Sequence, residues 1–367
     1  MNKRMIFHVP LKLQDGYVSG STIRPQRMMK AFQEIGYKVD VVWGTSSERK
    51  IAIQKIKKRI VSGVKYDFLY AENNTAPRLI ATDKHHIPRH PFVDKNFFVF
   101  LKEHNIPMGI FYRDLYWKYP KSMENLSWWK RKLIIYMQKR ELAEYEQLFD
   151  VLFLPSMRCL EPLETVFSRE IYPLPPAAPN LDLKESIKEN GKLNVFYVGG
   201  LGYQYDLSLF LSVVREFSNI DFVLCCRTND WEREKDKLNE FMGENIHIIH
   251  EQGIGLEKYY KNADIACLFI KPDIYIEMAM PVKLFEYLGH GLPMISVSNV
   301  AAADFIESID AGWTLPHSRE LLRSLLQELI DNPATIAEKR VNIKRALKDN
   351  TWEARAEQVV QYLRGDE

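Results

Sequence analysis

The chain has 367 residues, 46% of them hydrophobic and 27% charged, which excludes a long disordered protein, a collagen-like repeat and a disulfide-stapled miniprotein. At about 150 residues per domain, this length predicts two domains. Residues 1–180 hold 29 Lys and Arg against 18 Asp and Glu, a net charge of +11, whereas residues 181–367 hold 21 against 30, a net charge of −9, so the two domains should have different partners.

Cysteine spacing and hydropathy predict a cytoplasmic protein, and the positive charge of the first half limits the classes of partner that it can bind. No disulfide or zinc-ligand spacing relates the four cysteines, Cys159, Cys225, Cys226 and Cys267. No apolar run approaches the roughly 18 residues of a membrane-spanning helix, and residues 1–14 lack the pattern of a cleaved leader. The basic half could meet nucleic acid, an anionic membrane or a phosphorylated substrate, but no nucleic-acid-binding motif occurs, so nucleic acid is not an expected partner.

In the first half, apolar segments of strand length alternate with helical patterns, which is typical of a parallel sheet with helices on both faces. The segment 172–180, YPLPPAAPN, contains four prolines that can neither donate to a sheet nor continue a helix. We therefore expect a stiff connector there and a first domain of residues 1–178. Strands are expected at 5–9, 39–43, 68–70, 108–112 and 151–154, and helices at 24–35, 51–61 and 128–148.

The loops after these strands carry candidate ligand contacts, because ligands of doubly wound sheets bind beyond the carboxyl ends of the strands. Gly20 and Ser21 precede a helix, where a glycine would let a ligand approach the helix N-terminus, and Arg24 could hold a phosphate or a sugar hydroxyl. An ordinary Ser/Thr cap is the alternative. The other candidates follow two further strands and are Glu72, Arg113 and Asp114.

Aromatic residues and cations are interleaved in residues 127–136, SWWKRKLIIY, at the start of an expected helix. Trp and Lys together favour the boundary between water and lipid, so this stretch could dock the basic half on an anionic membrane. A half-buried core helix with a solvated basic face explains the same pattern. The cations that could assist docking are Lys55, Lys57, Lys58 and Arg59.

The second half repeats the alternation, so we expect a second doubly wound domain at residues 179–349. Asn350-Thr351-Trp352-Glu353 offers a capped start for a final helix within residues 350–367. Strands are expected at 194–198, 221–226, 246–249, 264–269 and 294–297, and helices at 207–217, 231–241, 256–261, 282–289, 320–330 and 334–347.

Glycines directly after the first strand of the second half could let a ligand approach the main chain. Gly199, Gly200 and Gly202 belong to the segment VGGLG, and such a loop can bring a sugar diphosphate to backbone amides. Structural glycines in a tight turn explain the segment equally well. A dinucleotide fingerprint would need glycine at position 205, where Tyr205 stands, so a nicotinamide enzyme is not expected.

The segment 280–291, MPVKLFEYLGHG, carries the strongest signal for a binding site. Pro281 suits the first turn of a helix, whose free N–H groups and positive dipole end attract a diphosphate, and Lys283 would add a full charge. Glu286 lies three residues later on the same face, where its carboxylate could accept hydrogen bonds from two ribose hydroxyls. As isolated residues, a solvated helical Lys–Glu pair would explain them. Arg227 and Thr228, after the strand at 221–226, are further candidate contacts, with a surface arginine as the alternative.

This segment resembles the P-x-K-x-x-E-Y motif of GT-B glycosyltransferases of the family 1 and family 4 group, in which a strand of the form G-x-P-V-I-S follows. Here Gly291-Leu292-Pro293-Met294-Ile295-Ser296 follows, so the match spans about 17 residues. The resemblance implies an α/β GT-B fold: two doubly wound Rossmann-like domains facing a cleft, with the acceptor domain first, the nucleotide-sugar domain second and a C-terminal helix crossing back to the first. It also implies that Lys283 binds the diphosphate of the donor and Glu286 its ribose.

The resemblance further implies transfer of a sugar from a nucleotide-sugar, expected to be a UDP-sugar, to a saccharide acceptor that is lipid-linked, in surface polysaccharide assembly. No D-x-D motif marks a metal-bound donor, so we expect neither a metal nor a cofactor, and Lys283 with helix amides would neutralise the diphosphate. The expected place is the cytoplasm, with peripheral attachment to the membrane.

Inversion at the anomeric carbon requires a positioned base, for which Asp114 is the first candidate and Glu72 the second. Retention would need no protein base. The retaining pattern of the family has two glutamates with seven residues between them, but Met278 stands eight positions before Glu286, with Glu277 one place off. The sequence therefore favours inversion. A non-hydrolysing UDP-sugar 2-epimerase and a catalytically silent GT-B partner subunit are the alternative functions.

Overall fold

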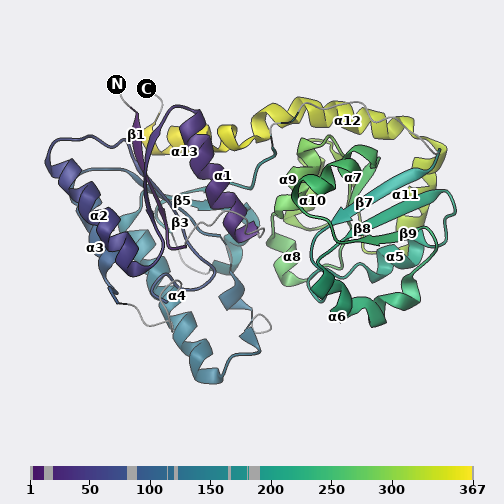
Figure 1. Ribbon diagram of the computed structural model, residues 1–367, viewed down its shortest axis with the longest axis horizontal. Coiled ribbons are helices and arrows are strands. Elements are labelled where there is room, and N and C mark those ends of the chain that lie inside the picture. Colours follow the sequence, from purple (N-terminus) through teal and green to yellow (C-terminus); the bar gives the residue numbers. More distant parts are fainter. Residues whose placement is uncertain are drawn as a thin grey trace. The chain divides into compact units, whose positions relative to one another are not determined.

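The computed structural model describes residues 3–11, 20–80, 89–113, 115–119, 123–163, 167–179, 181 and 191–365, with the main chain alone at 20–22. Two compact units make up the chain (Figure 1). Unit 1 comprises Met1–Pro176 and Trp352–Glu367, and unit 2 comprises Ala177–Thr351. These divisions lie two residues from the boundaries expected at 178 and 349.

Unit 1 is built on a six-stranded sheet in the order β2-β1-β3-β4-β5-β6, with every pair of neighbouring strands parallel. Helix α1 packs on α13, and α3 contacts both α2 and α4, so the helices form two groups on either side of the strands (Figure 1). The strands are β1 (Arg4–Val9), β2 (Lys38–Trp43), β3 (Leu69–Glu72), β4 (Met108–Phe111), β5 (Val151–Leu154) and β6 (Glu170–Pro173), and the helices are α1 (Gly20–Glu34), α2 (Ser46–Val61), α3 (Val93–Glu103), α4 (Trp128–Leu148) and α13 (Trp352–Arg364).

Two helices of unit 1 begin earlier than the sequence predicts. Helix α2 starts at Ser46 instead of residue 51, because Thr45 caps it: the Thr45 hydroxyl accepts from the Glu48 N–H and the Glu48 carboxylate accepts from the Thr45 N–H. Helix α1 starts at Gly20 instead of residue 24, with Pro25 in its second turn. Proline there removes a single intrahelical hydrogen bond, so it does not mark the helix start.

The expected connector at 172–180 is partly wrong, because its first two residues, Tyr172 and Pro173, belong to β6. This strand pairs with β5 alone, with Val151 opposite Glu170 and Leu154 opposite Pro173. An edge strand leaves one side of its main chain unpaired, so the missing N–H of Pro173 does not interrupt a ladder. The sequence analysis also did not predict helix α3.

Unit 2 has a second parallel six-stranded sheet, in the order β12-β11-β10-β7-β8-β9. Strand β12 and helices α8 and α10 were not anticipated from the sequence. The strands are β7 (Leu193–Val198), β8 (Ile220–Cys225), β9 (Ile246–Ile249), β10 (Ile265–Leu268), β11 (Met294–Val297) and β12 (Gly312–Leu315), and the helices are α5 (Ser208–Val214), α6 (Thr228–Leu238), α7 (Glu257–Asn262), α8 (Ile274–Met278), α9 (Val282–Gly289), α10 (Ala301–Ser308), α11 (Arg319–Asp331) and α12 (Ala334–Leu347).

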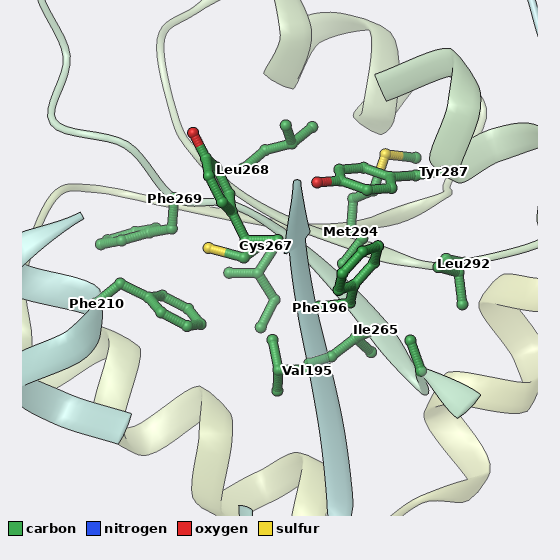
Figure 2. Packing of buried hydrophobic residues seen from close by; sticks show 14 of the residues in the cluster. Val195, Phe196, Phe210, Ile265, Cys267, Leu268, Phe269, Tyr287, Leu292 and Met294 are labelled. Atoms are coloured by element: carbon green, nitrogen blue, oxygen red, sulfur yellow. The ribbon is translucent and has the colours of Figure 1, made fainter. Parts of the chain in front are cut away.

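The central strands of unit 2 are buried on both faces. Every residue of β10 and β11 is buried, as the near-continuous apolar runs of parallel strands require. Figure 2 shows Val195 and Phe196 of β7 packed with Ile265 of β10 and Tyr287 of α9. Because this packing is rigid, it fixes α9 against the carboxyl ends of the central strands.

The last helix, α13, completes unit 1, as the resemblance implies. It packs on α1 and β4, and its Tyr362 ring stacks on Tyr172 of β6 with the ring centres 3.6 Å apart. Gly109 of β4 permits this approach, because a Cβ there would lie 2.8 Å from the Phe153 ring and 3.1 Å from a methyl carbon of Leu363. The predicted GT-B arrangement of two Rossmann-like units and a returning helix is confirmed.

Candidate functional site

The strand order places one ligand-binding position in each unit. In unit 2, the chain leaves β7 for β8 on one side and later returns to β10 on the other, so the switch point lies between β7 and β10. In unit 1, the corresponding point lies between β1 and β3. The glycine loop follows β7, and Glu72 ends β3, so the predicted residues gather at these two points.

The loop that contains Gly199, Gly200 and Gly202 in unit 2, called here the glycine loop, lies against Lys283. A Cβ at Gly199 would lie 2.9 Å from Lys283 Nζ and 3.1 Å from the Tyr197 hydroxyl, so a side chain there would displace the lysine ammonium. Gly202 has a φ of +123°, a conformation that other residues rarely adopt. The Tyr197 hydroxyl donates to the Gly200 carbonyl at 2.7 Å, which holds the loop against the strand.

Lys283 has its ammonium group inside the protein without a hydrogen-bond acceptor among the described residues. Only 8% of the residue is exposed. Its Nζ lies 4.0 Å from the Tyr197 ring centre and 5.0 Å from that of Tyr205, so aromatic faces are its main favourable contacts. Burial lowers the pKa of Lys283 to about 7, with smaller opposing contributions from Cys267 and Glu286. A buried cation without an anion is costly, which makes this position suited to an incoming negative charge.

Lys283 lies in the first turn of α9, where the sequence predicts it. Pro281 is the N-cap of this helix. The first N–H groups of a helix have no acceptor within the helix, and the dipole adds positive potential there. Buried Lys283, the start of α9 and Gly199 therefore form one positively charged position, which we call the α9 anion position.

Glu286 does not form an ion pair with Lys283, so the alternative of a solvated helical Lys–Glu pair does not describe this segment. Its Oε2 instead accepts from the Tyr260 hydroxyl at 3.4 Å. The Tyr260 ring stacks on His290 with the ring centres 3.8 Å apart, and His290 Nδ1 lies 2.8 Å from the Glu286 carbonyl. The Glu286 carboxylate is therefore held by a network, one helical turn beyond Lys283.

Arg227 and Thr228 lie at the surface, at the start of α6. Burial raises the pKa of Tyr205, and the nearby Arg227 guanidinium partly opposes this rise. Tyr205 also packs on Gly200, whose Cβ would lie 3.3 Å from the ring. Tyr205 thus connects the glycine loop, Lys283 and Arg227.

In unit 1, three of the predicted residues meet in a buried ionic cluster. Glu72 is fully buried, with Oε1 3.4 Å from Arg24 Nε and Oε2 3.1 Å from an Arg113 nitrogen. The Tyr70 hydroxyl donates to Glu72 Oε1 at 3.0 Å. With both oxygens occupied, this carboxylate is better suited to orienting the two arginines than to accepting a proton from an acceptor.

Arg24 is fixed from several sides. Its guanidinium lies 3.6 Å from the Phe111 ring centre and donates to the Pro175 carbonyl at 3.1 Å. Arg355 of α13 is buried beside it, and burial, aided by the charge of Arg24, lowers the pKa of Arg355 to about 10. Arg24 and Arg113 therefore bring two cations to the Glu72 carboxylate, and Arg355 brings a third close to Arg24.

For three of the predicted residues, no side-chain contacts are described. Asp114 lies outside the described residues, and Gly20 and Ser21 are described only as main chain in the first turn of α1. The sequence analysis missed the contribution of four residues because each acts through a distant partner and belongs to no motif. They are Tyr197, Tyr205, Tyr260 and Arg355.

The family described as glycosyl transferases group 1 matches residues 192–332, which lie within unit 2. No curated protein matches the chain. Sucrose-phosphate synthase from Thermosynechococcus elongatus has a similar structure, with a TM-score of 0.65 at 14% identity over 98% of this chain and 98% of that chain.

Two further solved structures have the same fold. WaaG, a glycosyltransferase involved in lipopolysaccharide biosynthesis, has a TM-score of 0.58 at 13% identity and covers 98% of this chain and 100% of its own. Anabaena HepE, solved in complex with UDP and glucose, has a TM-score of 0.61 at 9% identity over 98% and 99%. The shared GT-B fold and the group 1 match within unit 2 agree with the resemblance expected from residues 280–296.

The described part of the chain contains neither a membrane-spanning helix nor a cluster of metal-ligating side chains. None of its helices combines the length and the apolar character needed to cross a bilayer. None of its groups of three or more His, Cys, Asp and Glu side chains has the arrangement of a metal site.

Proposed function

We propose that this protein transfers a glycosyl group from a UDP-sugar to a saccharide acceptor and needs no metal ion to bind the donor. The observation that carries the proposal is the buried Lys283 ammonium, which finds no hydrogen-bond acceptor in the part of the chain that the structure describes and lies against Gly199 at the switch point of unit 2. A diphosphate at the α9 anion position would supply the missing negative charge. Lys283 and the amides of α9 would then stabilise the departing diphosphate.

Glu286 supports a nucleoside over a bare diphosphate. Its carboxylate lies one helical turn from Lys283 and is oriented by Tyr260, and a carboxylate can accept hydrogen bonds from ribose hydroxyls. The UDP assignment draws on Anabaena HepE, which was solved with UDP and with UDP-glucose. Uracil is the part of the proposal that rests on this likeness.

Unit 1 supports an acceptor with hydroxyl or anionic groups. Arg24 and Arg113 are held by Glu72 at the switch point between β1 and β3, where their guanidinium groups could meet an acceptor. We expect a lipid-linked saccharide in surface polysaccharide assembly, because the basic unit also suits an anionic membrane surface on the cytoplasmic side.

The test combines binding with product analysis. Thermal unfolding with UDP, ADP, GDP and their sugars should give a rise in midpoint for one nucleotide, growing with the logarithm of its concentration. Incubation of that nucleotide-sugar with saccharide acceptors, followed by NMR, should then reveal a glycoside. If the protein isomerises the nucleotide-sugar in the absence of an acceptor, it is an epimerase and the proposal is wrong. If it binds the nucleotide-sugar but transfers the sugar to no acceptor, the silent partner subunit is favoured.

A further inference from the structure

We propose that the first half of α4 docks unit 1 on an anionic lipid bilayer, with the aromatic side chains of its exposed face in the interface. Residues 128–140 contain five Lys and Arg, two Trp and no Asp or Glu. Figure 1 shows α4 extending past α2 and α3. The docking site is separate from the α9 anion position, which belongs to unit 2.

The exposed face of α4 is defined by helical geometry. At about 100° per residue, Trp128, Trp129, Lys132, Leu133 and Tyr136 fall within an arc of about 140°. All five side chains are exposed, Trp128 at 70% and Trp129 at 52%. The buried residues of the helix, Gln138, Glu141, Leu142 and Tyr145, point to the opposite side. We call the five exposed residues the α4 face.

Single exposed apolar residues are common in soluble proteins, but a contiguous group with two tryptophans marks an interaction surface. Lys130, Lys132 and Arg140 of this helix lie over aromatic rings. Lys132 Nζ is 5.2 Å from the Trp128 ring centre, and Arg140 is 5.9 Å from that of Tyr136. Exposed rings with cations beside them match the interface of an anionic leaflet, where the ring enters the headgroup layer and the charge stays with the phosphates.

Two of the other predicted docking cations are engaged within the protein. Lys57 lies 4.4 Å from the Phe100 ring centre, and Arg59 pairs with Asp40 at 2.6 Å. Because these contacts already use their charge, Lys57 and Arg59 are not part of the docking surface, whereas Lys55 and Lys58 are exposed and stay predicted docking cations.

Cosedimentation with vesicles tests the proposal, using phosphatidylcholine alone and phosphatidylcholine with 30% phosphatidylglycerol. The protein should bind the anionic vesicles and be released at 0.5 M NaCl, because added salt shortens the screening length. The double variants Trp129→Ser/Leu133→Ser and Lys132→Ser/Arg140→Ser should each weaken this binding by roughly tenfold or more. Brominated lipids should quench tryptophan fluorescence in the wild type and much less in the first variant.

Matched controls come from exposed positions of unit 2. Leu321→Ser/Val341→Ser and Lys344→Ser/Lys348→Ser should bind vesicles like the wild type. Lys283→Met should also bind vesicles normally, so failure of the donor proposal would not be mistaken for failure of docking. Circular dichroism checks that each variant is folded.

Two results would overturn the docking proposal. One is vesicle binding that is insensitive to lipid charge and to the α4 variants. The other is a concentration-dependent dimer in sedimentation velocity that both α4 variants abolish, with no vesicle binding, because the α4 face would then be covered by a second copy of the chain.

Discussion

The ammonium of Lys283 lies 4.0 Å from the ring centre of Tyr197 and has no hydrogen-bond acceptor among the described residues. An aromatic ring replaces only part of the hydration that a buried cation loses. The ligand-free protein therefore contains a position that binding of an anion would stabilise. Stability and donor binding should respond in opposite directions when this lysine is removed.

Replacing Lys283 by Met should raise the free energy of unfolding of the ligand-free protein at pH 6 by roughly 2–5 kcal/mol, because a buried charge is removed and the apolar volume is kept. The same variant should weaken UDP binding by about 1.5–3 kcal/mol, the usual contribution of a charge-assisted contact. Urea unfolding and calorimetry measure the two effects. Glu286→Gln is the comparison and should weaken UDP binding without stabilising the protein. Unchanged UDP affinity in both variants would remove the donor assignment.

The stabilising effect of Lys283→Met should depend on pH. The pKa of Lys283 is about 7 in the folded protein and near its ordinary 10.5 when unfolded. Between these values the unfolded state binds more protons, so the contribution of Lys283 to the free energy of unfolding rises with pH from 7 to 10.5. The stability difference between variant and wild type should therefore be constant below pH 7 and shrink above it. A difference that stays constant to pH 10 would contradict burial of the charge.

Donor affinity should fall as pH rises above 7, by at most about tenfold per pH unit, because a diphosphate binds the protonated lysine and must draw a proton onto Lys283. Calorimetry in buffers of different ionisation enthalpy should detect this proton uptake at pH 8. Lys283→Met should lack this part of the uptake. Identical uptake in variant and wild type would assign the proton to another group.

Tyr260 should act as a positioning residue for Glu286. In Tyr260→Phe the carboxylate loses the hydroxyl that holds it at 3.4 Å, so UDP should bind about three- to tenfold more weakly. Binding of 2′-deoxy-UDP should change much less, because the ribose contact is already missing. Tyr259→Phe, at the neighbouring position, is the control. Equal losses for both ligands would indicate general damage to the site.

The two candidate bases of unit 1 should respond differently to loss of charge. Glu72→Gln should destabilise the protein by about 3–5 kcal/mol, because Arg24 and Arg113 would lose their buried counter-charge. Asp114→Asn should instead lower kcat by roughly 10²- to 10⁴-fold with donor affinity nearly constant. Urea unfolding and steady-state kinetics separate the two effects. Near-normal turnover by Asp114→Asn would remove it as base, and a product of retained configuration would remove the need for a protein base.

The sequence predicts best those elements that local pattern alone defines. Strands β5, β9 and β11 have the predicted bounds because each is a short, mostly apolar run that begins directly after Asp150, Asn245 or Pro293. Helices α9 and α12 also match, since a proline directly precedes each of them. Strand β6 was missed because its Pro173 is tolerated only at a sheet edge, and edge position is a property of the whole sheet.

The candidate site was predictable in residue type but not in environment. The motif at 281–286 identifies Lys283 and Glu286, yet burial of Lys283 depends on Tyr197, which is 86 positions earlier in the chain. Likewise, Glu72 was expected at a loop rim, and the structure makes it the last residue of β3, enclosed by two arginines. Side chains that converge from distant strands leave no local signal.

The return of α13 to unit 1 has a consequence for synthesis of the protein on the ribosome. Unit 2 is one continuous segment, whereas unit 1 needs Trp352–Glu367, the last part to be translated. Until then, Gly109 and the Tyr172 ring lack the helix that covers them. Unit 2 can therefore finish folding while the earlier unit is still incomplete, which inverts the usual N-terminal-first order of multidomain chains. A chain that ends at Thr351 should therefore present a completed unit 2 and an open, chaperone-accessible unit 1.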